Sequence, residues 1–126
     1  MHENDLSFAI IGAAFEVHKY YGPGLFESVY QVALAKEIVR RGLSVQSQVS
    51  IPVDYYGENL GIGFKADLIV CGKVIVEVKS VESVHDVHYK QLLTYLRLTD
   101  KKLGILINFN EANLQHGIRR VVNGLT

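Results

Sequence analysis

The sequence predicts a single α/β domain over residues 1–126, in which a mixed β-sheet is flanked by helices. Three observations support this. Apolar residues first recur at helical spacing, then alternate with polar residues as in strands, and then return to helical spacing before a short apolar strand. The predicted helices are residues 4–21, 26–41 and 86–98, and the predicted strands are residues 45–53, 60–70, 73–81 and 103–109.

The two N-terminal helices are separated by Gly22-Pro23-Gly24, which stops the first periodic segment. The second helix ends before Gly42, where a left-handed cap is favourable. The expected core faces carry Ile10, Ala14, Val17 and Tyr21 in the first helix and Val29, Ala33, Leu34 and Ile38 in the second.

The strands are expected to begin with an antiparallel meander. In the first strand, alternation places Val45, Val49, Ile51 and Val53 on one face. A tight turn at Cys71-Gly72 joins the next two strands. A helix precedes the strand at residues 103–109, which allows that strand to lie parallel to an earlier one. The segment at residues 118–122 is ambiguous between strand and helix.

The amino-acid composition restricts the classes of function that are expected for this chain. Lys plus Arg and Asp plus Glu number 13 each, so the total charge lacks the basic excess of many nucleic-acid binders. Cys71 is the only cysteine, which excludes an internal disulfide and leaves oxygen atoms as the expected metal ligands. No apolar run approaches the roughly 18 residues that span a bilayer, so we expect a soluble, cytoplasmic protein without a membrane partner.

Asp67 lies in one predicted strand, and Glu77 and Lys79 lie in the next. Because side chains alternate, Glu77 and Lys79 point to the same face, about 7 Å apart. Mg²⁺ prefers one or two carboxylates together with other oxygen atoms, which suits Asp67, Glu77 and the backbone carbonyl of Val78. Lys79 could orient a water or stabilise charge on a phosphate. Taken alone, the Glu-x-Lys pattern is also typical of a surface hairpin with an ion pair.

A shared site requires a particular strand register. If residues 71–72 alone formed the turn, Asp67 and Glu77 would point to opposite faces of the sheet. A three-residue loop at residues 71–73, or a bulge, would place the two carboxylates directly opposite each other. The hypothesis of a metal site therefore predicts the longer loop or a bulge.

The predicted second and third helices carry further polar residues that are candidates for the site. His88, Gln91 and Tyr95 share one face of the third helix, where an amide can hold a phosphate and a tyrosine can stack on a base. Glu27 lies in the first turn of the second helix, and Tyr30 lies one turn further on the same face. The alternatives are that the third-helix residues cover the core edge and that Glu27 only stabilises its helix end.

Further elements occur in a characteristic order: His18, Gly22-Pro23-Gly24, Glu27, Tyr30, Ala66-Asp67, Glu77-Val78-Lys79, Gln91 to Tyr95, Gly104, Asn108-Phe109 and Gly117 to Arg120. With them the chain resembles the GxxExxY proteins of the PD-(D/E)XK nuclease superfamily from His18 through Asn123. The resemblance implies a restriction-endonuclease-like αβββαβ core with an extra N-terminal helix. It also implies a metal site at Asp67, Glu77 and Lys79, with Glu27 joining it. Ala66 stands where the name-giving motif has proline.

The function expected from these residues is Mg²⁺- or Mn²⁺-dependent phosphodiester hydrolysis of nucleic acid, and DNA is the expected substrate. Gln91 is expected among the catalytic residues, and Arg119 and Arg120 are expected to position phosphates. A chain this small covers few nucleotides, which favours a homodimer. One alternative is an inactive nucleic-acid-binding or assembly domain of the same fold. Another is a small-molecule hydrolase or a structural dimer without a nucleic-acid role.

Overall fold

The computed structural model describes all 126 residues and contains three α-helices and five strands. The helices are α1 (Glu3–Tyr21), α2 (Glu27–Arg40) and α3 (Asp86–Thr99), and the strands are β1 (Val45–Tyr55), β2 (Glu58–Val70), β3 (Val74–Lys79), β4 (Leu103–Asn108) and β5 (Ile118–Val122). A short 3₁₀ helix, η1 (Leu114–Gly117), precedes β5. The predicted order of helices and strands is confirmed.

The strands form one sheet in the order β1-β2-β3-β4-β5. All neighbours are antiparallel except β3 and β4, which are parallel because α3 carries the chain across between them. The ambiguous C-terminal segment is a strand, since residues 118–122 pair with β4 in the antiparallel direction. The predicted mixed sheet, and the αβββαβ order after an extra N-terminal helix, are therefore confirmed.

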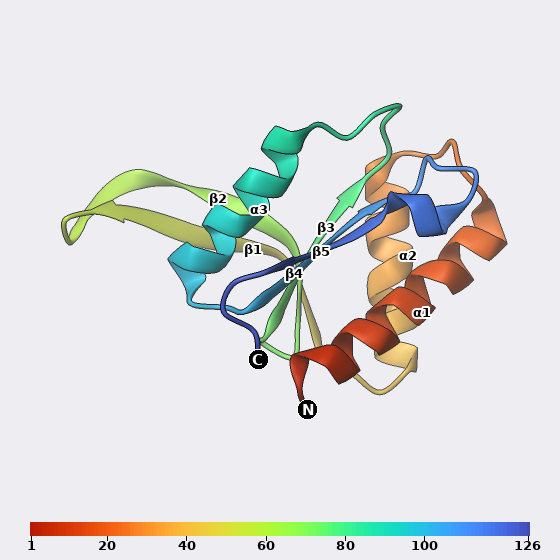
Figure 1. Cartoon of the computed structure of the whole chain (residues 1–126), viewed down its shortest axis with the longest axis horizontal. Coiled ribbons are helices and arrows are strands. Elements are labelled where there is room, and N and C mark those ends of the chain that lie inside the picture. Colours follow the sequence, from red (N-terminus) through yellow and green to blue (C-terminus); the bar gives the residue numbers. More distant parts are fainter.

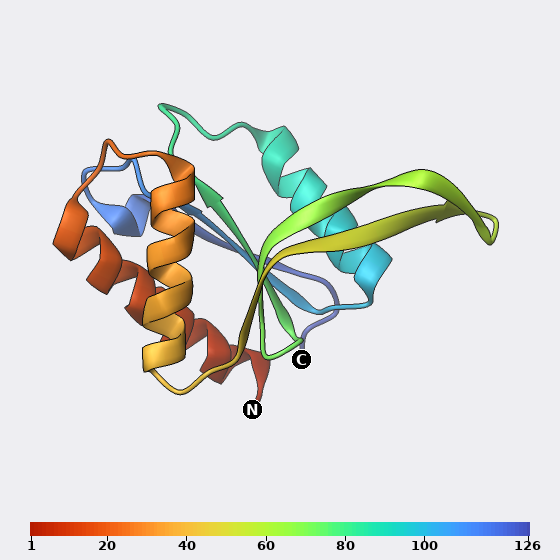
Figure 2. The same ribbon diagram turned by 180° about the vertical axis from the view of Figure 1, so that it is seen from behind.

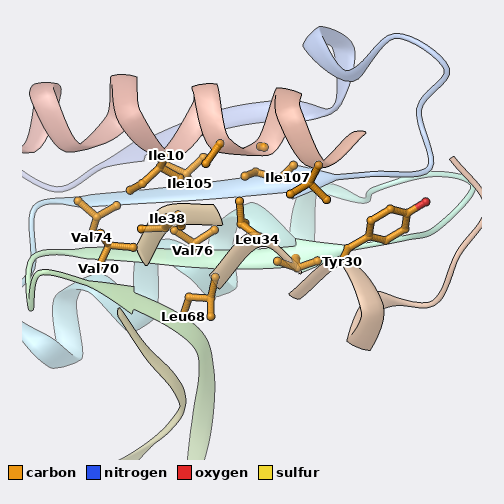
Figure 3. Packing of buried hydrophobic residues seen from close by; sticks show 14 of the residues in the cluster. Ile10, Tyr30, Leu34, Ile38, Leu68, Val70, Val74, Val76, Ile105 and Ile107 are labelled. Carbon is orange, nitrogen blue, oxygen red and sulfur yellow. The ribbon is translucent and has the colours of Figure 1, made fainter. Parts of the chain in front are cut away.

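Helices α1 and α2 cover one face of the sheet and α3 covers the other (Figures 1 and 2). The larger core cluster lies under α1 and α2, where Val74 and Val76 of β3 pack with Leu34 and Ile38 of α2 (Figure 3). A smaller cluster lies under α3 and includes Ile75 of β3. Strand β3 is therefore apolar on both faces near its start, which leaves Glu77 as its one buried charged residue.

The core face of α2 differs from the expectation. Val29 is 37% exposed and Ala33 only half-buried, whereas Tyr30, Leu34 and Ile38 are buried. The helix is rotated by about one residue relative to the predicted orientation, because the large ring of Tyr30 takes the core position that was expected for the smaller Val29. Tyr21 in α1 is likewise exposed, since the helix ends there.

The expected face of β1 is also wrong beyond its first residues. Val45 packs against the cluster under α1 and α2, whereas Val49 packs against the cluster under α3. The cause is Gln48, which has a left-handed backbone (φ 52°) that interrupts the alternation. Strand β2 changes face at the same level, since Leu68 belongs to the first cluster and Ala66 to the second.

Beyond this point β1 and β2 continue as a two-stranded arm, residues 49–66, that projects from the sheet beside α3 (Figures 1 and 2). The arm contacts α3 where the rings of Phe64 and Tyr95 stack, with centroids 3.5 Å apart. Its tip exposes Tyr55 and Tyr56. The arm and α3 therefore form one side of the molecule together.

Helix α3 packs tightly on the sheet at Gly104 of β4. A Cβ atom at this position would lie 2.8 Å from both Cγ and Cδ1 of Leu92, which is buried in α3. Any side chain at position 104 would overlap Leu92. Glycine therefore sets the distance between α3 and the sheet.

Candidate active site

The strand register brings Asp67 and Glu77 together. Strands β2 and β3 pair Val70 with Val74 and Leu68 with Val76, so this register, continued one step past the last pair, places Asp67 opposite Glu77. Both side chains lie on the face of the sheet that α3 covers. The predicted three-residue loop at residues 71–73 is confirmed, and the two-residue alternative is excluded.

The Asp67 carboxylate is held by the neighbouring strand. Its Oδ2 accepts a hydrogen bond of 2.8 Å from the backbone N–H of Val78, between Glu77 and Lys79. A carboxylate that accepts a backbone hydrogen bond has a fixed orientation, because the donor belongs to the sheet. Asp67 is therefore oriented toward the Glu-x-Lys strand before any ligand binds.

Glu77 lies in an environment that opposes its charge. It is 9% exposed, and its Oε1 atom is buried without a hydrogen-bond partner. Burial, together with hydrogen bonding and charge from the adjacent Asp67 carboxylate, raises the pKa of Glu77 to about 9, although the Lys79 ammonium partly offsets the effect. Without a cation, Glu77 therefore holds a proton at neutral pH.

A divalent cation fits this pair of carboxylates. The unpartnered Oε1 of Glu77 is an available acceptor, and a cation would remove the repulsion between the two carboxylates. No three His, Cys, Asp or Glu side chains lie close enough together to bind a metal. A site with two carboxylates suits Mg²⁺, which keeps water and phosphate oxygens as its other ligands.

Glu27 is not part of this pair, contrary to the expectation that it is a metal ligand. Its Oε2 accepts a hydrogen bond of 3.2 Å from the backbone N–H of Ser80, the residue after Lys79. The Ser80 hydroxyl donates in turn to the carbonyl of Leu25 (2.6 Å). The first turn of α2 therefore fixes the end of β3, and this backbone contact, rather than a third place beside the carboxylates, explains the position of Glu27.

Tyr30 is a core residue, and the expectation that it binds nucleic acid is wrong. Its side chain is fully buried and stacks on Phe109, with ring centroids 4.6 Å apart. The hydroxyl donates to the carbonyl of Gly22 and accepts from the N–H of Leu25 (3.1 Å). Tyr30 thus holds the glycine-rich turn that precedes α2.

Helix α3 brings Tyr95 near the carboxylates. Burial and then the charges of Glu77 and Asp67 raise the pKa of Tyr95, which places its hydroxyl in the field of the pair. Gln91, one turn earlier, is exposed and makes no side-chain hydrogen bond within the protein. His88 differs, because its Nδ1 accepts from the N–H of His85 (3.2 Å) and caps the helix.

The two arginines of β5 lie on opposite faces of the sheet. Arg119 pairs with Leu106 in the row of Asp67 and Glu77, and its guanidinium lies 4.0 Å from the centre of the Tyr89 ring. Arg120 points to the α1 face, where it donates to Asn4 (2.6 Å). The two arginines, both expected to position phosphates, therefore lie on different faces, since adjacent strand residues alternate, and only Arg119 shares the face of the carboxylates.

Sequence reasoning assigned no structural role to Asn108, a buried polar residue at the end of β4 beside Lys79. Its side chain accepts from the N–H groups of Val81 and Asn110 and donates to the carbonyl of Val81 (3.0 Å). It thereby fixes the loop that leaves β3. The signal was present, because a buried amide at the end of an otherwise apolar strand requires partners.

A polar cleft of about 220 Å³ opens beside Asn108. It is lined by Glu82, Ser83, Val84, Tyr89, Asn108, Glu111, His116 and Gly117. Because Lys79 pairs with Asn108, the cleft adjoins the lysine end of the candidate site.

Comparison with known proteins identifies one family. The model of the PD-(D/E)XK nuclease superfamily matches residues 4–121, which is nearly the whole chain. No curated protein and no solved structure shows a significant match. None of the helices is both long and apolar enough to cross a membrane.

Proposed function

Since this chain belongs to the PD-(D/E)XK nuclease superfamily, we propose that it hydrolyses phosphodiester bonds of nucleic acid, with DNA as substrate and Mg²⁺ or Mn²⁺ as cofactor. The observation that carries the proposal is the pairing of partly buried Asp67 with buried Glu77, which has one unpartnered carboxylate oxygen. The finer assignment to the GxxExxY group belongs to the same proposal.

In this proposal Asp67 and Glu77 hold the cation, and the carbonyl of Val78 is a further ligand. The chemistry that Mg²⁺ supplies when bound is positive charge, which polarises a phosphate and acidifies water. Lys79 extends from the same face of β3, where its ammonium orients the attacking water or stabilises charge on the phosphate. Gln91 donates its amide to a phosphate oxygen from the edge of α3.

Substrate contacts are proposed on the same face of the sheet. Arg119 is exposed in the row of the two carboxylates and can neutralise a phosphate. The hydroxyl of Tyr95 and the free Nε2 of His88 border the site from α3. A cytoplasmic location and a homodimer that widens the contact surface complete the proposal.

A competing function is nucleic-acid binding without cleavage. One observation favours it, because Glu27 is engaged by Ser80 and does not add a third carboxylate to the site. A two-carboxylate site is sufficient for Mg²⁺, which is why we prefer the nuclease. A cleavage assay with single-stranded, duplex and branched DNA and with RNA, with and without Mg²⁺ or Mn²⁺, separates the two functions.

Metal binding is tested with Asp67→Ala. A cation at a hundred times its Kd stabilises the folded protein by about 2.7 kcal/mol through mass action. Wild type should therefore unfold at a higher temperature in millimolar Mn²⁺, whereas Asp67→Ala should not respond. Asp54→Ala, which removes an exposed carboxylate from the arm, is the matched control and should respond as wild type does. An equal response of Asp67→Ala and wild type would remove Asp67 from the site.

A further inference from the structure

The backbone beside Asp67 departs from regular strand pairing. Strands β1 and β2 pair Ser47 with Leu68 and Val49 with Ala66, yet the intervening step, Gln48 opposite Asp67, is not paired. At this step Gln48 has a left-handed backbone (φ 52°). Beyond it, the apolar side chains of both strands belong to the core cluster on the opposite face of the sheet. A non-glycine residue persists in this conformation only where its surroundings hold it there.

A side-chain amide of α2 bridges the irregular step. Gln31 donates through Nε2 to the carbonyl oxygen of Asp67 (3.4 Å) and accepts through Oε1 from Nε2 of Gln48 (3.0 Å). Gln31 is partly buried and lies one helical turn after Glu27, which accepts from the N–H of Ser80. One row of α2 therefore contacts the backbone of β2 at Asp67 and the backbone of Ser80, the residue that directly follows β3.

We propose that Gln31 is a positioning residue, which holds the backbone at the point where the strands change face so that the Asp67 carboxylate faces Glu77. This inference rests on the proposed function of the site. The role needs a donor and an acceptor on one side chain, because the Asp67 carbonyl accepts and the Gln48 amide donates. Glutamine provides both, glutamate lacks the donor, and leucine lacks both.

The Val78 amide reports the position of Asp67 directly. Its N–H donates to Asp67 Oδ2 at 2.8 Å, so a displaced carboxylate changes its resonance and its hydrogen exchange even in the absence of metal and substrate. Gln31→Leu should shift the Val78 amide resonance and reduce its protection, and leave the amide of Ile105 in β4 unchanged. Because positioning acts on the chemical step, kcat should fall about 10- to 100-fold with KM nearly unchanged.

The experiment uses the full chain and three variants. Gln31→Leu removes both bonds, Gln31→Glu keeps only the acceptor for Gln48, and Gln46→Leu is the matched control, an exposed glutamine of β1 without a side-chain hydrogen bond. Gln31→Glu should show the Val78 change and the loss of kcat, and it decides the question if Gln31→Leu does not fold.

The outcomes separate the two proposals. An undisturbed Val78 amide in the Gln31 variants, or an equal change in Gln46→Leu, would overturn the positioning role. A rise in KM with unchanged kcat would overturn it as well, because it would make Gln31 a substrate contact. If wild type cleaves no nucleic acid, the proposed function fails, and the Val78 amide alone then decides whether Gln31 positions Asp67.

Discussion

The charge of Glu77 should destabilise the metal-free protein, and Glu77→Gln should remove this effect. Glutamine has nearly the same shape but never ionises. Because the pKa of Glu77 is raised from 4.5 to about 9, the folded protein keeps a proton that the unfolded chain loses above pH 4.5. The stability contributed by this residue therefore falls as the pH rises from 4.5 to about 9 and is constant outside that window.

The magnitude of this destabilisation follows from the shift in the pKa of Glu77. Each pH unit within the window changes the free energy of unfolding by about 1.4 kcal/mol. Between pH 4.5 and pH 7.5 the loss is therefore about 4 kcal/mol. This is a large part of the total stability of a small domain, which is on the order of 5–15 kcal/mol.

Urea unfolding in EDTA at pH 5, 6, 7 and 8 measures the difference between Glu77→Gln and wild type. The variant should gain about 1.4 kcal/mol relative to wild type with each unit of pH. Glu58→Gln, at an exposed carboxylate of β2, is the control, and its difference from wild type should not change with pH. Millimolar Mn²⁺ should stabilise wild type at pH 8 and leave Glu77→Gln unaffected.

If the free energies of unfolding of Glu77→Gln and wild type change in parallel with pH, the predicted destabilisation by Glu77 is refuted. They would mean that Glu77 ionises as readily in the folded protein as in the unfolded chain, so that burial beside Asp67 does not oppose its charge. The absence of a metal response in wild type would separately contradict the proposed cation site.

Three further predictions concern the other candidate residues. Lys79→Ala should lower kcat about 10²- to 10³-fold and leave DNA affinity nearly unchanged; wild-type turnover in a single-turnover assay would exclude the proposed role. Arg119→Ala should weaken DNA binding and reduce the slope of affinity against salt by about one unit, whereas Arg120→Ala should do neither; equal slopes in fluorescence titrations would contradict the assignment. Tyr30→Phe should destabilise the fold by about 1–3 kcal/mol in urea, because it removes both partly buried hydrogen bonds of the hydroxyl to the glycine-rich turn; weaker DNA binding at unchanged stability would argue against a core role.

The sequence predicts the helices and strands well because hydrophobic periodicity is a local property. It also predicts the shared face of Asp67 and Glu77, since strand alternation and loop length together determine the register. The burial of Tyr30 was not predictable in the same way. A tyrosine at helical spacing suits either a core or a surface, and the stacking partner Phe109 is 79 residues away in the chain.

The irregular strand pairing at Gln48 could not be predicted from the sequence either. Strict alternation of residues 45–53 predicts a regular strand, and nothing in a glutamine indicates a left-handed backbone. The change of face arises from tertiary contacts, because one end of the β1–β2 pair packs under α2 and the other under α3. The opposite faces of Arg119 and Arg120 follow from alternation once residues 118–122 are known to form a strand.

Gly104 affects the distance between α3 and the carboxylates of Asp67 and Glu77. Leu92 rests on this residue where any other amino acid would place a carbon atom, so the missing methyl group determines how far α3 stands above the sheet. Tyr95 lies three residues later in the same helix, so its position relative to the sheet depends on the same contact. The distance between α3 and the two carboxylates therefore depends on Gly104, which pairs with Ile75 and not with Glu77. Alanine at position 104 would push α3 away from the sheet and enlarge that distance, and Tyr95 would be displaced together with the helix.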